Sequence, residues 1–157
     1  DKKVVINFSD FLRDRIDYFD EIANLNNITM SFLIDDNLFV SIDQMQLQRL
    51  IDNTIYNAIK YSPEQNCIKI GLSKECDRIS FRTINKAIEP IDVENIFVRF
   101  ARGDSARGGF GIGLHLVRYI CAKNGIGIEV KNLDSNEVLF EYLFDDFLSS
   151  VDRMQGF

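Results

Sequence analysis

Residues 52–62 are the most informative segment of the sequence and read Asp52-Asn53-Thr54-Ile55-Tyr56-Asn57-Ala58-Ile59-Lys60-Tyr61-Ser62. It lies within a longer segment, 43–61, whose Leu47, Ile51, Ile55 and Ala58 recur at the spacing of one helical face. Pro63 ends this pattern because a proline cannot continue a helix. Residues 43–61 are therefore predicted to form a helix whose apolar side lies on a sheet.

The opposite face of this helix carries two amides and an ammonium group. Asn53 and Asn57 are four residues apart and Lys60 is three further on, so all three project from one side. Taken alone, a polar face exposed to solvent would explain them. However, asparagine is a poor helix former, and two of them in mid-helix favour a site. Amide oxygens suit Mg²⁺ and lysine suits phosphate.

A glycine-rich segment precedes a second predicted helix at 112–123. It reads Gly108-Gly109-Phe110-Gly111-Ile112-Gly113-Leu114. Glycines let backbone amides approach phosphate oxygens, and the following helix adds the positive end of its dipole. A dinucleotide-binding unit has similar glycines, but there they follow a hydrophobic strand. Here they follow Phe97-Val98-Arg99-Phe100-Ala101-Arg102-Gly103-Asp104, so that alternative fails.

Together, these elements resemble the catalytic domain of sensor histidine kinases. Residues 52–62 look like the family's N box, residues 96–102 like its F box, and residues 109–114 like its G2 box. The resemblance spans roughly residues 3–143, and the N box is its most specific part. It implies membership of a superfamily with DNA gyrase and heat-shock chaperone ATPases, in which a Glu takes the place of Asn53. Because an amide cannot act as a general base, hydrolysis of ATP by an activated water is disfavoured.

The resemblance implies a role for each matching residue. Asn57 would ligate Mg²⁺, Asn53 would line the phosphate site, and Lys60 with Tyr61 would border the nucleotide. Arg99 and Arg102 would approach the phosphates from a lid. The predicted catalytic residues are Asn53 and Lys60, and the predicted ATP-binding residues are Asn57, Tyr61, Asn85, Arg99, Arg102, Gly109, Gly111, Gly113 and Leu114.

One motif departs from the family pattern. The family's G1 box supplies an Asp that accepts a hydrogen bond from the adenine amino group, followed by glycines. Here the corresponding residues 82–90 lack that carboxylate and both glycines. Counting back from Phe97 without gaps places Thr83 at the Asp position, whereas a two-residue deletion places Asn85 there. The chemistry favours Asn85, because its amide oxygen can accept from an amine.

Loss of the charged hydrogen bond would cost about 1.5 to 3 kcal/mol, which weakens a site without erasing it. The alternative is therefore a degenerate pseudokinase domain that binds nucleotide weakly or not at all and acts through protein contacts.

The remaining segments predict an α/β fold. Half-buried strands are expected at 4–8, 28–34, 38–42, 67–72, 78–84, 126–130 and 138–144, and a helix capped by Ser9 or Asp10 follows the first of them. Asp35, Asp36 and Asn37 are turn formers, so 28–34 and 38–42 are expected to pair as a hairpin. The expected architecture is a two-layer sandwich, in which three helices cover one face of a mixed, mostly antiparallel sheet (a Bergerat-type ATP-binding fold).

The last residues fall outside the resemblance. We expect a catalytic domain at 1–144 and an extension at 145–157 that forms a short helix. From Phe144 onward, apolar residues recur at helical spacing, and this stripe is expected to lie on the domain's own surface. They are Phe144, Phe147, Leu148, Val151 and Met154.

Composition limits the partners and the location. The net charge of -6 and the pI near 4.8 argue against a surface for nucleic acid or anionic lipid. No apolar run is long enough to span a bilayer, so this domain is expected in the cytoplasm, and any inner-membrane anchor of the full-length protein would lie in other segments. Cys67, Cys76 and Cys121 are too widely spaced to suggest a zinc site or a disulfide framework.

The reaction implied is transfer of the γ-phosphoryl group of ATP, with Mg²⁺, to a histidine on a separate dimerisation domain. The implied partners are that domain, a cognate response regulator and a second subunit in the full-length protein. The single histidine, His115, is followed by Leu116 rather than an acidic residue, so it is expected to be an ordinary helix residue. A serine-directed protein kinase of the same superfamily is the rival, since it would need no histidine-bearing hairpin.

Overall fold

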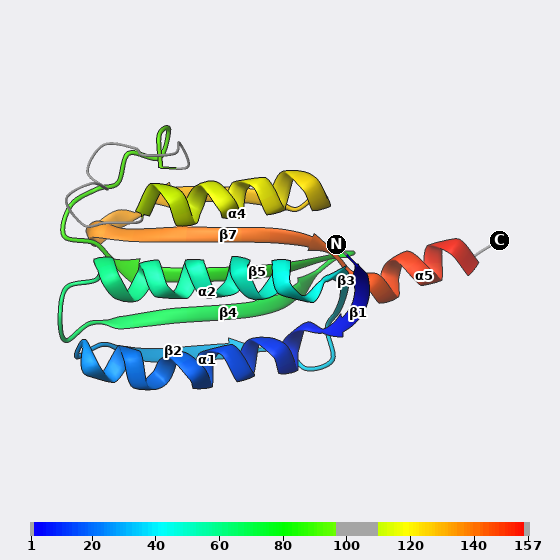
Figure 1. Ribbon diagram of the computed structural model, residues 1–157, viewed down its shortest axis with the longest axis horizontal. Helices are drawn as coiled ribbons and strands as arrows, with labels where there is room; N and C mark the ends of the chain where they lie inside the picture. Colours follow the sequence, from blue (N-terminus) through cyan, green and yellow to red (C-terminus); the bar gives the residue numbers. More distant parts are fainter. Residues whose placement is uncertain (1, 97–109, 156–157) are drawn as a thin grey trace.

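The computed structural model describes residues 2–96 and 110–155 and contains two sheets (Figure 1). A five-stranded sheet has the order β2-β4-β5-β7-β6, and a two-stranded sheet pairs β1 with β3. Only β2 and β4 are parallel, and every other pair is antiparallel. The strands are β1 (Lys3–Asn7), β2 (Thr29–Ile34), β3 (Phe39–Asp43), β4 (Cys67–Glu75), β5 (Arg78–Lys86), β6 (Gly127–Asn132) and β7 (Glu137–Asp145).

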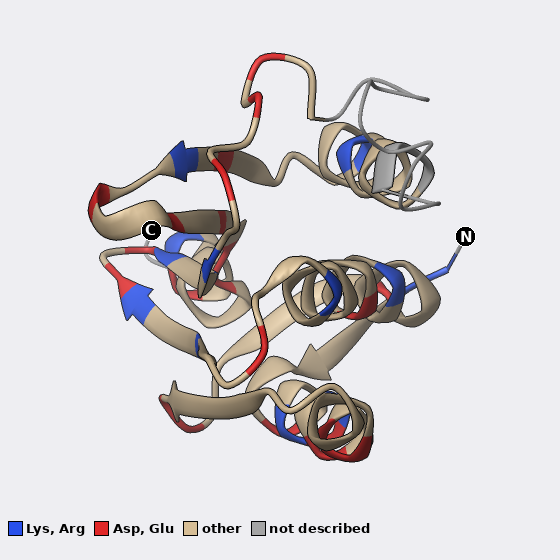
Figure 2. Cartoon of the chain, turned by 90° about the vertical axis from the view of Figure 1, so that its left-hand side faces the viewer, with Lys and Arg blue, Asp and Glu red and all other residues tan. Residues whose placement is uncertain are grey.

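Three helices cover one face of the five-stranded sheet, as the end-on view in Figure 2 makes plain. They are α1 (Phe8–Leu25), α2 (Gln44–Tyr61) and α4 (Phe110–Asn124). The core lies between the two layers, where Phe8 packs edge-on against Phe144 and Phe81 stacks on Tyr142. The predicted two-layer α/β sandwich with a mixed, mostly antiparallel sheet is confirmed. None of the helices in the described part of the chain is long and apolar enough to cross a membrane.

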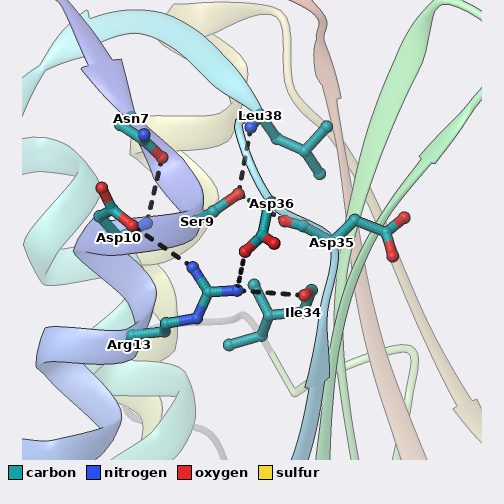
Figure 3. A network of polar contacts seen from close by, with 8 residues as sticks. All are labelled: Asn7, Ser9, Asp10, Arg13, Ile34, Asp35, Asp36 and Leu38. Atoms are coloured by element: carbon teal, nitrogen blue, oxygen red, sulfur yellow. Dashed lines mark hydrogen bonds and ion pairs between the residues drawn. The ribbon is translucent and has the colours of Figure 1, made fainter.

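The start of α1 differs from the prediction. The N-cap is Asn7, whose Oδ1 accepts a hydrogen bond from the backbone N–H of Asp10 at 3.1 Å, and not Ser9 or Asp10. Ser9 lies inside the helix and is fully buried. Its hydroxyl donates to the carbonyl oxygen of Asp35 at 2.6 Å and accepts from the backbone N–H of Leu38 at 3.1 Å. Ser9 therefore holds the turn between β2 and β3 instead of capping the helix (Figure 3).

The predicted hairpin of 28–34 with 38–42 is wrong. β2 pairs with β4 in the large sheet, whereas β3 pairs with β1 in the small one. Contacts from α1 hold the turn, because Arg13 forms ion pairs with Asp10 and Asp36 beside the Ser9 contacts (Figure 3). The turn thus carries the chain from one sheet to the other. Parallel pairing also places Met30 of β2 level with Ile68 of β4, which continues the apolar face of the large sheet.

The C-terminal helix α5 (Phe147–Gln155) extends beyond the end of the sheet (Figure 1). None of its residues is buried. It is attached at its start, because the buried carboxylate of Asp146 accepts a hydrogen bond from Ser149 at 2.7 Å and pairs with Lys74 at 3.1 Å. Arg153 adds an exposed ion pair with Asp77 at 2.9 Å. Polar contacts therefore account for much of its attachment.

Candidate functional site

Two asparagines of α2 lie against the first turn of α4. Asn53 donates from Nδ2 to the carbonyl oxygen of Arg49 at 2.8 Å, which orients its amide along the helix. A Cβ built on Gly113 would lie 2.7 Å from Oδ1 of Asn53 and 3.9 Å from Nδ2 of Asn57. A side chain at position 113 would therefore displace an amide, and glycine is needed for this approach.

The first turn of α4 offers a place for an anion. The helix begins at Phe110, so Gly111 and Gly113 both belong to this turn. The first N–H groups of a helix have no partner within it and carry the positive end of its dipole. Leu114 is fully buried and anchors the turn in the core. Backbone donors and the amides of α2 thus lie at one place, and phosphate groups suit such a place.

A pocket opens between α2, the end of β5 and β7. It encloses about 320 Å³, including solvent-open space at its mouth. Most of its wall is apolar, with a few polar groups among the lining residues, as in sites for small organic ligands. The lining residues are Thr54, Asn57, Ala58, Tyr61, Asn85, Ala87, Ile91, Val138 and Phe140.

Asn57 belongs both to the pocket and to the contact with α4. It is buried, and its Nδ2 has no hydrogen-bond partner among the described residues. A buried polar group without a partner is costly, so an amide kept in this state is typical of a ligand site. Its amide oxygen is a suitable Mg²⁺ ligand. No cluster of three or more His, Cys, Asp or Glu side chains occurs in the described ranges, so a metal here would rely on this amide, phosphate oxygens and water.

The pocket differs in its relation to the two residues that the sequence offered for the adenine contact. Thr83 and Asn85 lie on the same face of β5, and both are buried. Asn85 lines the pocket, whereas Thr83 does not. The amide of Asn85 donates from Nδ2 to the carbonyl oxygen of Lys86 at 2.8 Å. Its Oδ1 accepts no hydrogen bond from a described residue, which leaves an acceptor in the pocket.

The basic and aromatic residues at the end of α2 lie close together. Nζ of Lys60 is 5.7 Å from the ring centre of Tyr61 and 6.0 Å from that of Tyr56. These distances fall in the range of weak cation–π contacts. Tyr61 lines the pocket and Lys60 lies beside it on the helix. The structure therefore brings Lys60 and Tyr61 to the same end of the helix as Asn57.

Three predicted site residues lie outside the described residues. They are Arg99, Arg102 and Gly109. His115 lies on α4 and is exposed.

Sequence reasoning missed the apolar wall of the pocket and its support. Val138 and Phe140 belong to an alternating strand and gave no signal beyond core packing. Thr54 lines the pocket too, and its hydroxyl donates to the carbonyl oxygen of Leu50 at 2.8 Å and lies 2.7 Å from the hydroxyl of Tyr142. Complete burial raises the pKa of Tyr142, so its hydroxyl stays protonated and donates to Thr54.

Comparison with known proteins identifies the family. Residues 42–137 match the histidine kinase-, DNA gyrase B- and HSP90-like ATPases. The sensor histidine kinase WalK of Bacillus subtilis is 38% identical over 101 residues, which cover 59% of this chain and 16% of WalK. The sensor histidine kinase HprS of Escherichia coli is 34% identical over 115 residues, covering 70% of this chain and 25% of HprS.

Solved structures share the fold. The catalytic domain of histidine kinase ThkA superposes with a TM-score of 0.80 at 24% identity, over 93% of this chain and 98% of that domain. The chain spans a quarter or less of WalK and HprS. The match over residues 42–137 covers the asparagines of α2, the start of α4 and all of the residues that line the pocket except Val138 and Phe140. The chain therefore belongs to the family of histidine kinase-, DNA gyrase B- and HSP90-like ATPases, as an ATP-binding domain of the sensor histidine kinase type.

Proposed function

We propose that this chain binds ATP with Mg²⁺ and transfers its γ-phosphoryl group to a histidine on a separate dimerisation domain of the same kinase. The observation that carries the proposal is the meeting of three features. They are a mostly apolar pocket with a free acceptor on Asn85, the amide nitrogen of Asn57 that has no described partner, and the first turn of α4 at Gly113, and they lie in one continuous region.

The pocket between α2 and β7 suits the nucleobase. Its apolar wall, formed by residues such as Ile91, Val138 and Phe140, can cover a flat heteroaromatic ring. Asn85 lies at its edge and takes the role of the adenine-contacting acidic residue of the family. Tyr61 would border the base or the ribose from the end of α2.

The phosphates belong at the other side of Asn57. The free N–H groups at the start of α4, with the glycines at 109, 111 and 113, would cradle phosphate oxygens. The amide oxygen of Asn57 would hold a Mg²⁺ ion, which would supply positive charge against the phosphates. Asn53 and Lys60 would contact the terminal phosphate, and Arg99 and Arg102 would add positive charge.

In phosphoryl transfer the protein contributes mainly by positioning the reactants and by neutralising charge. An imidazole nitrogen of the acceptor histidine attacks the γ-phosphorus, the bond to the β,γ-bridging oxygen breaks, and ADP leaves. Asn53 cannot remove a proton from water, which favours transfer over hydrolysis. We take residues 1–144 as the catalytic unit and 145–157 as an extension. A response regulator and a second subunit are the partners proposed for the whole protein.

Calorimetry with a non-hydrolysable ATP analogue, with and without Mg²⁺, tests the proposal. The analogue should bind, and Mg²⁺ should increase the affinity. Replacing Asn57 by Ala should remove the increase and leave the melting temperature nearly unchanged, because the amide has no partner within the described protein to lose. Asn24 is exposed on α1 and provides the matched Asn→Ala control, which should behave as wild type.

Two outcomes would count against the proposal. Absence of binding under both conditions would indicate the non-catalytic alternative. Equal affinity with and without Mg²⁺ would remove the metal-binding role of Asn57.

A further inference from the structure

The amide of Asn85 has a fixed orientation in the pocket. Its Nδ2 donates to the carbonyl oxygen of Lys86 at 2.8 Å, and the side chain is only 5% exposed. Turning the amide over would place Oδ1 against that carbonyl oxygen, so that two acceptors would face each other at hydrogen-bond distance. The buried amide N–H group would also lose its partner, at a cost comparable to a lost hydrogen bond.

We infer that the carbonyl oxygen of Lys86 fixes the amide of Asn85 with its Oδ1 as an acceptor toward the ligand, so that this chain requires a neutral amide, and not a carboxylate, at position 85. This inference rests on the proposed function. It goes beyond the proposed function by assigning a positioning role to the main chain of Lys86 and by requiring an amide at position 85.

The first consequence concerns the base. Adenine presents an amine at C6, which can donate to Oδ1 of Asn85, whereas hypoxanthine presents a carbonyl oxygen at the same place. Two acceptors would then meet beside the buried side chain of Asn85. Buried polar groups left unpaired in this way reduce binding by about tenfold or more.

The second consequence concerns the residue itself. A carboxylate at position 85 would place a negatively charged oxygen beside the carbonyl of Lys86 and remove the donor that now satisfies it. The acidic residue of the family pattern is therefore excluded here in its charged form. Protonation would restore a donor, so a carboxyl group at this position would take up a proton more readily than usual, because burial and the carbonyl dipole both oppose its charge.

Binding of Mg·ATP and Mg·ITP to the whole chain tests the selectivity. These nucleotides differ in the base at C6 and N1 only. Wild type should prefer ATP by about tenfold or more. Replacing Asn85 by Ala should bring the two affinities together while the chain remains folded. Equal affinities in wild type, or an unchanged preference in Asn85→Ala, would overturn the inference.

The Asn85→Asp variant tests the orientation. It should bind ATP more weakly than wild type at about pH 7.5 and recover part of the loss at about pH 5.5, where a carboxyl group with a raised pKa is protonated. The other titratable groups near this position are Tyr61 on α2, Lys86 on β5 and Glu137, which pairs with Lys86 from β7. All are shared with wild type, so a pH effect confined to the variant reports the introduced carboxyl group.

Asn26→Asp is the matched control, because Asn26 also donates from Nδ2 to a backbone carbonyl, that of Ile22, at 2.8 Å but lies exposed at the end of α1. It should bind ATP as wild type does at both pH values. Binding by Asn85→Asp that equals or exceeds wild type at about pH 7.5 would overturn the fixed orientation and leave the proposed function standing. Failure of wild type to bind any nucleotide would instead remove the proposed function and this inference with it. If Asn85→Asp does not fold, the Asn85→Ala comparison decides.

Discussion

Gly113 of α4 and Asn53 of α2 approach so closely that a Cβ on the glycine would lie 2.7 Å from Oδ1 of the asparagine. Replacing Gly113 by Ala should therefore push this amide away from the start of α4 and lower the affinity for Mg·ATP about tenfold, the scale of one misplaced polar contact. Alanine has a high helix propensity, so the melting temperature should change little. Calorimetry and thermal melting check the two expectations.

Gly127 provides the control for this prediction. A Cβ there would meet Leu143 at 3.5 Å, an ordinary contact. The Gly127→Ala variant should bind ATP as wild type does. Unchanged affinity in Gly113→Ala would remove the contact between α2 and α4 from the site.

The side chain of Asn132 on β6 forms two hydrogen bonds with the backbone of Ile91, which lines the pocket. Its Nδ2 donates to the carbonyl oxygen of Ile91 at 3.0 Å, and its Oδ1 accepts from the N–H group at 3.1 Å. Replacing Asn132 by Ala should loosen this wall and weaken ATP binding several-fold, at a cost in stability of about 1 kcal/mol or less because the contact is exposed. Asn132→Asp keeps the acceptor and loses the donor, so its affinity for ATP should lie between that of wild type and that of Asn132→Ala. An affinity for Asn132→Ala equal to that of wild type would contradict this prediction.

Thr54 and Tyr142 should respond unequally to removal of their shared hydrogen bond. Thr54→Val leaves the hydroxyl of Tyr142 buried without an acceptor, which costs about 1 to 3 kcal/mol. Tyr142→Phe leaves Thr54 bonded to the carbonyl oxygen of Leu50, so about 0.5 to 1.5 kcal/mol is expected. Urea denaturation measures both free energies of unfolding. If Tyr142→Phe lowers the free energy of unfolding more than Thr54→Val does, Tyr142 is not the donor of this hydrogen bond.

The attachment of α5 should weaken in acid. Burial raises the pKa of Asp146, but the hydroxyl of Ser149 and the ammonium group of Lys74 outweigh this and hold the pKa below its ordinary value. A lowered pKa stabilises the fold above the unfolded-state value of about 4, and this stabilisation is lost as pH falls through the folded-state value. The melting temperature of wild type should exceed that of Asp146→Asn above about pH 5 and approach it below about pH 3.5. A constant difference at all pH values would contradict this.

The chain should not phosphorylate itself. Its only histidine is His115, which is exposed on α4, the helix whose first turn is assigned to the phosphates. Incubation with γ-labelled ATP should leave the protein unlabelled. Acid-labile label on His115 would contradict the assignment of the acceptor to another domain.

Much of this fold is readable from local patterns, because segments such as 43–61 and 78–84 bury one face and show it as a period. Pairing partners are not readable in this way. Turn formers at Asp35 and Asn37 predict a reversal of the chain, but contacts made by Ser9 and Arg13 across the turn decide that β2 and β3 enter different sheets. Such contacts depend on a helix that is distant in sequence from the turn.

Some residues of the candidate site could also be predicted from local sequence patterns, and others could not. Asn53 and Asn57 are unusual residues for the middle of a helix, and Gly113 belongs to a glycine-rich segment at the start of one. The sequence therefore indicated all three as site residues. Val138 and Ile91 are ordinary apolar residues that become part of a pocket only through the packing of β7 and α2. The position along β5 could not separate Thr83 from Asn85, because both lie on the same face of the strand; the sequence favoured Asn85 by its chemistry alone, and the structure adds that Asn85 lines the pocket.

Arg13 also occupies one backbone carbonyl at the exposed edge of the five-stranded sheet. β2 is the outer strand of the large sheet, and its six uncharged residues include Phe32 and Leu33, which are 53% and 77% exposed. The carbonyl oxygen of Ile34 is occupied by Arg13 at 3.2 Å, which places a cation at one end of this edge. Charged groups on edge strands hinder pairing with other chains. We therefore expect the same arginine that holds the turn to hinder aggregation, and we expect its loss to reduce solubility at high concentration before it affects ligand binding.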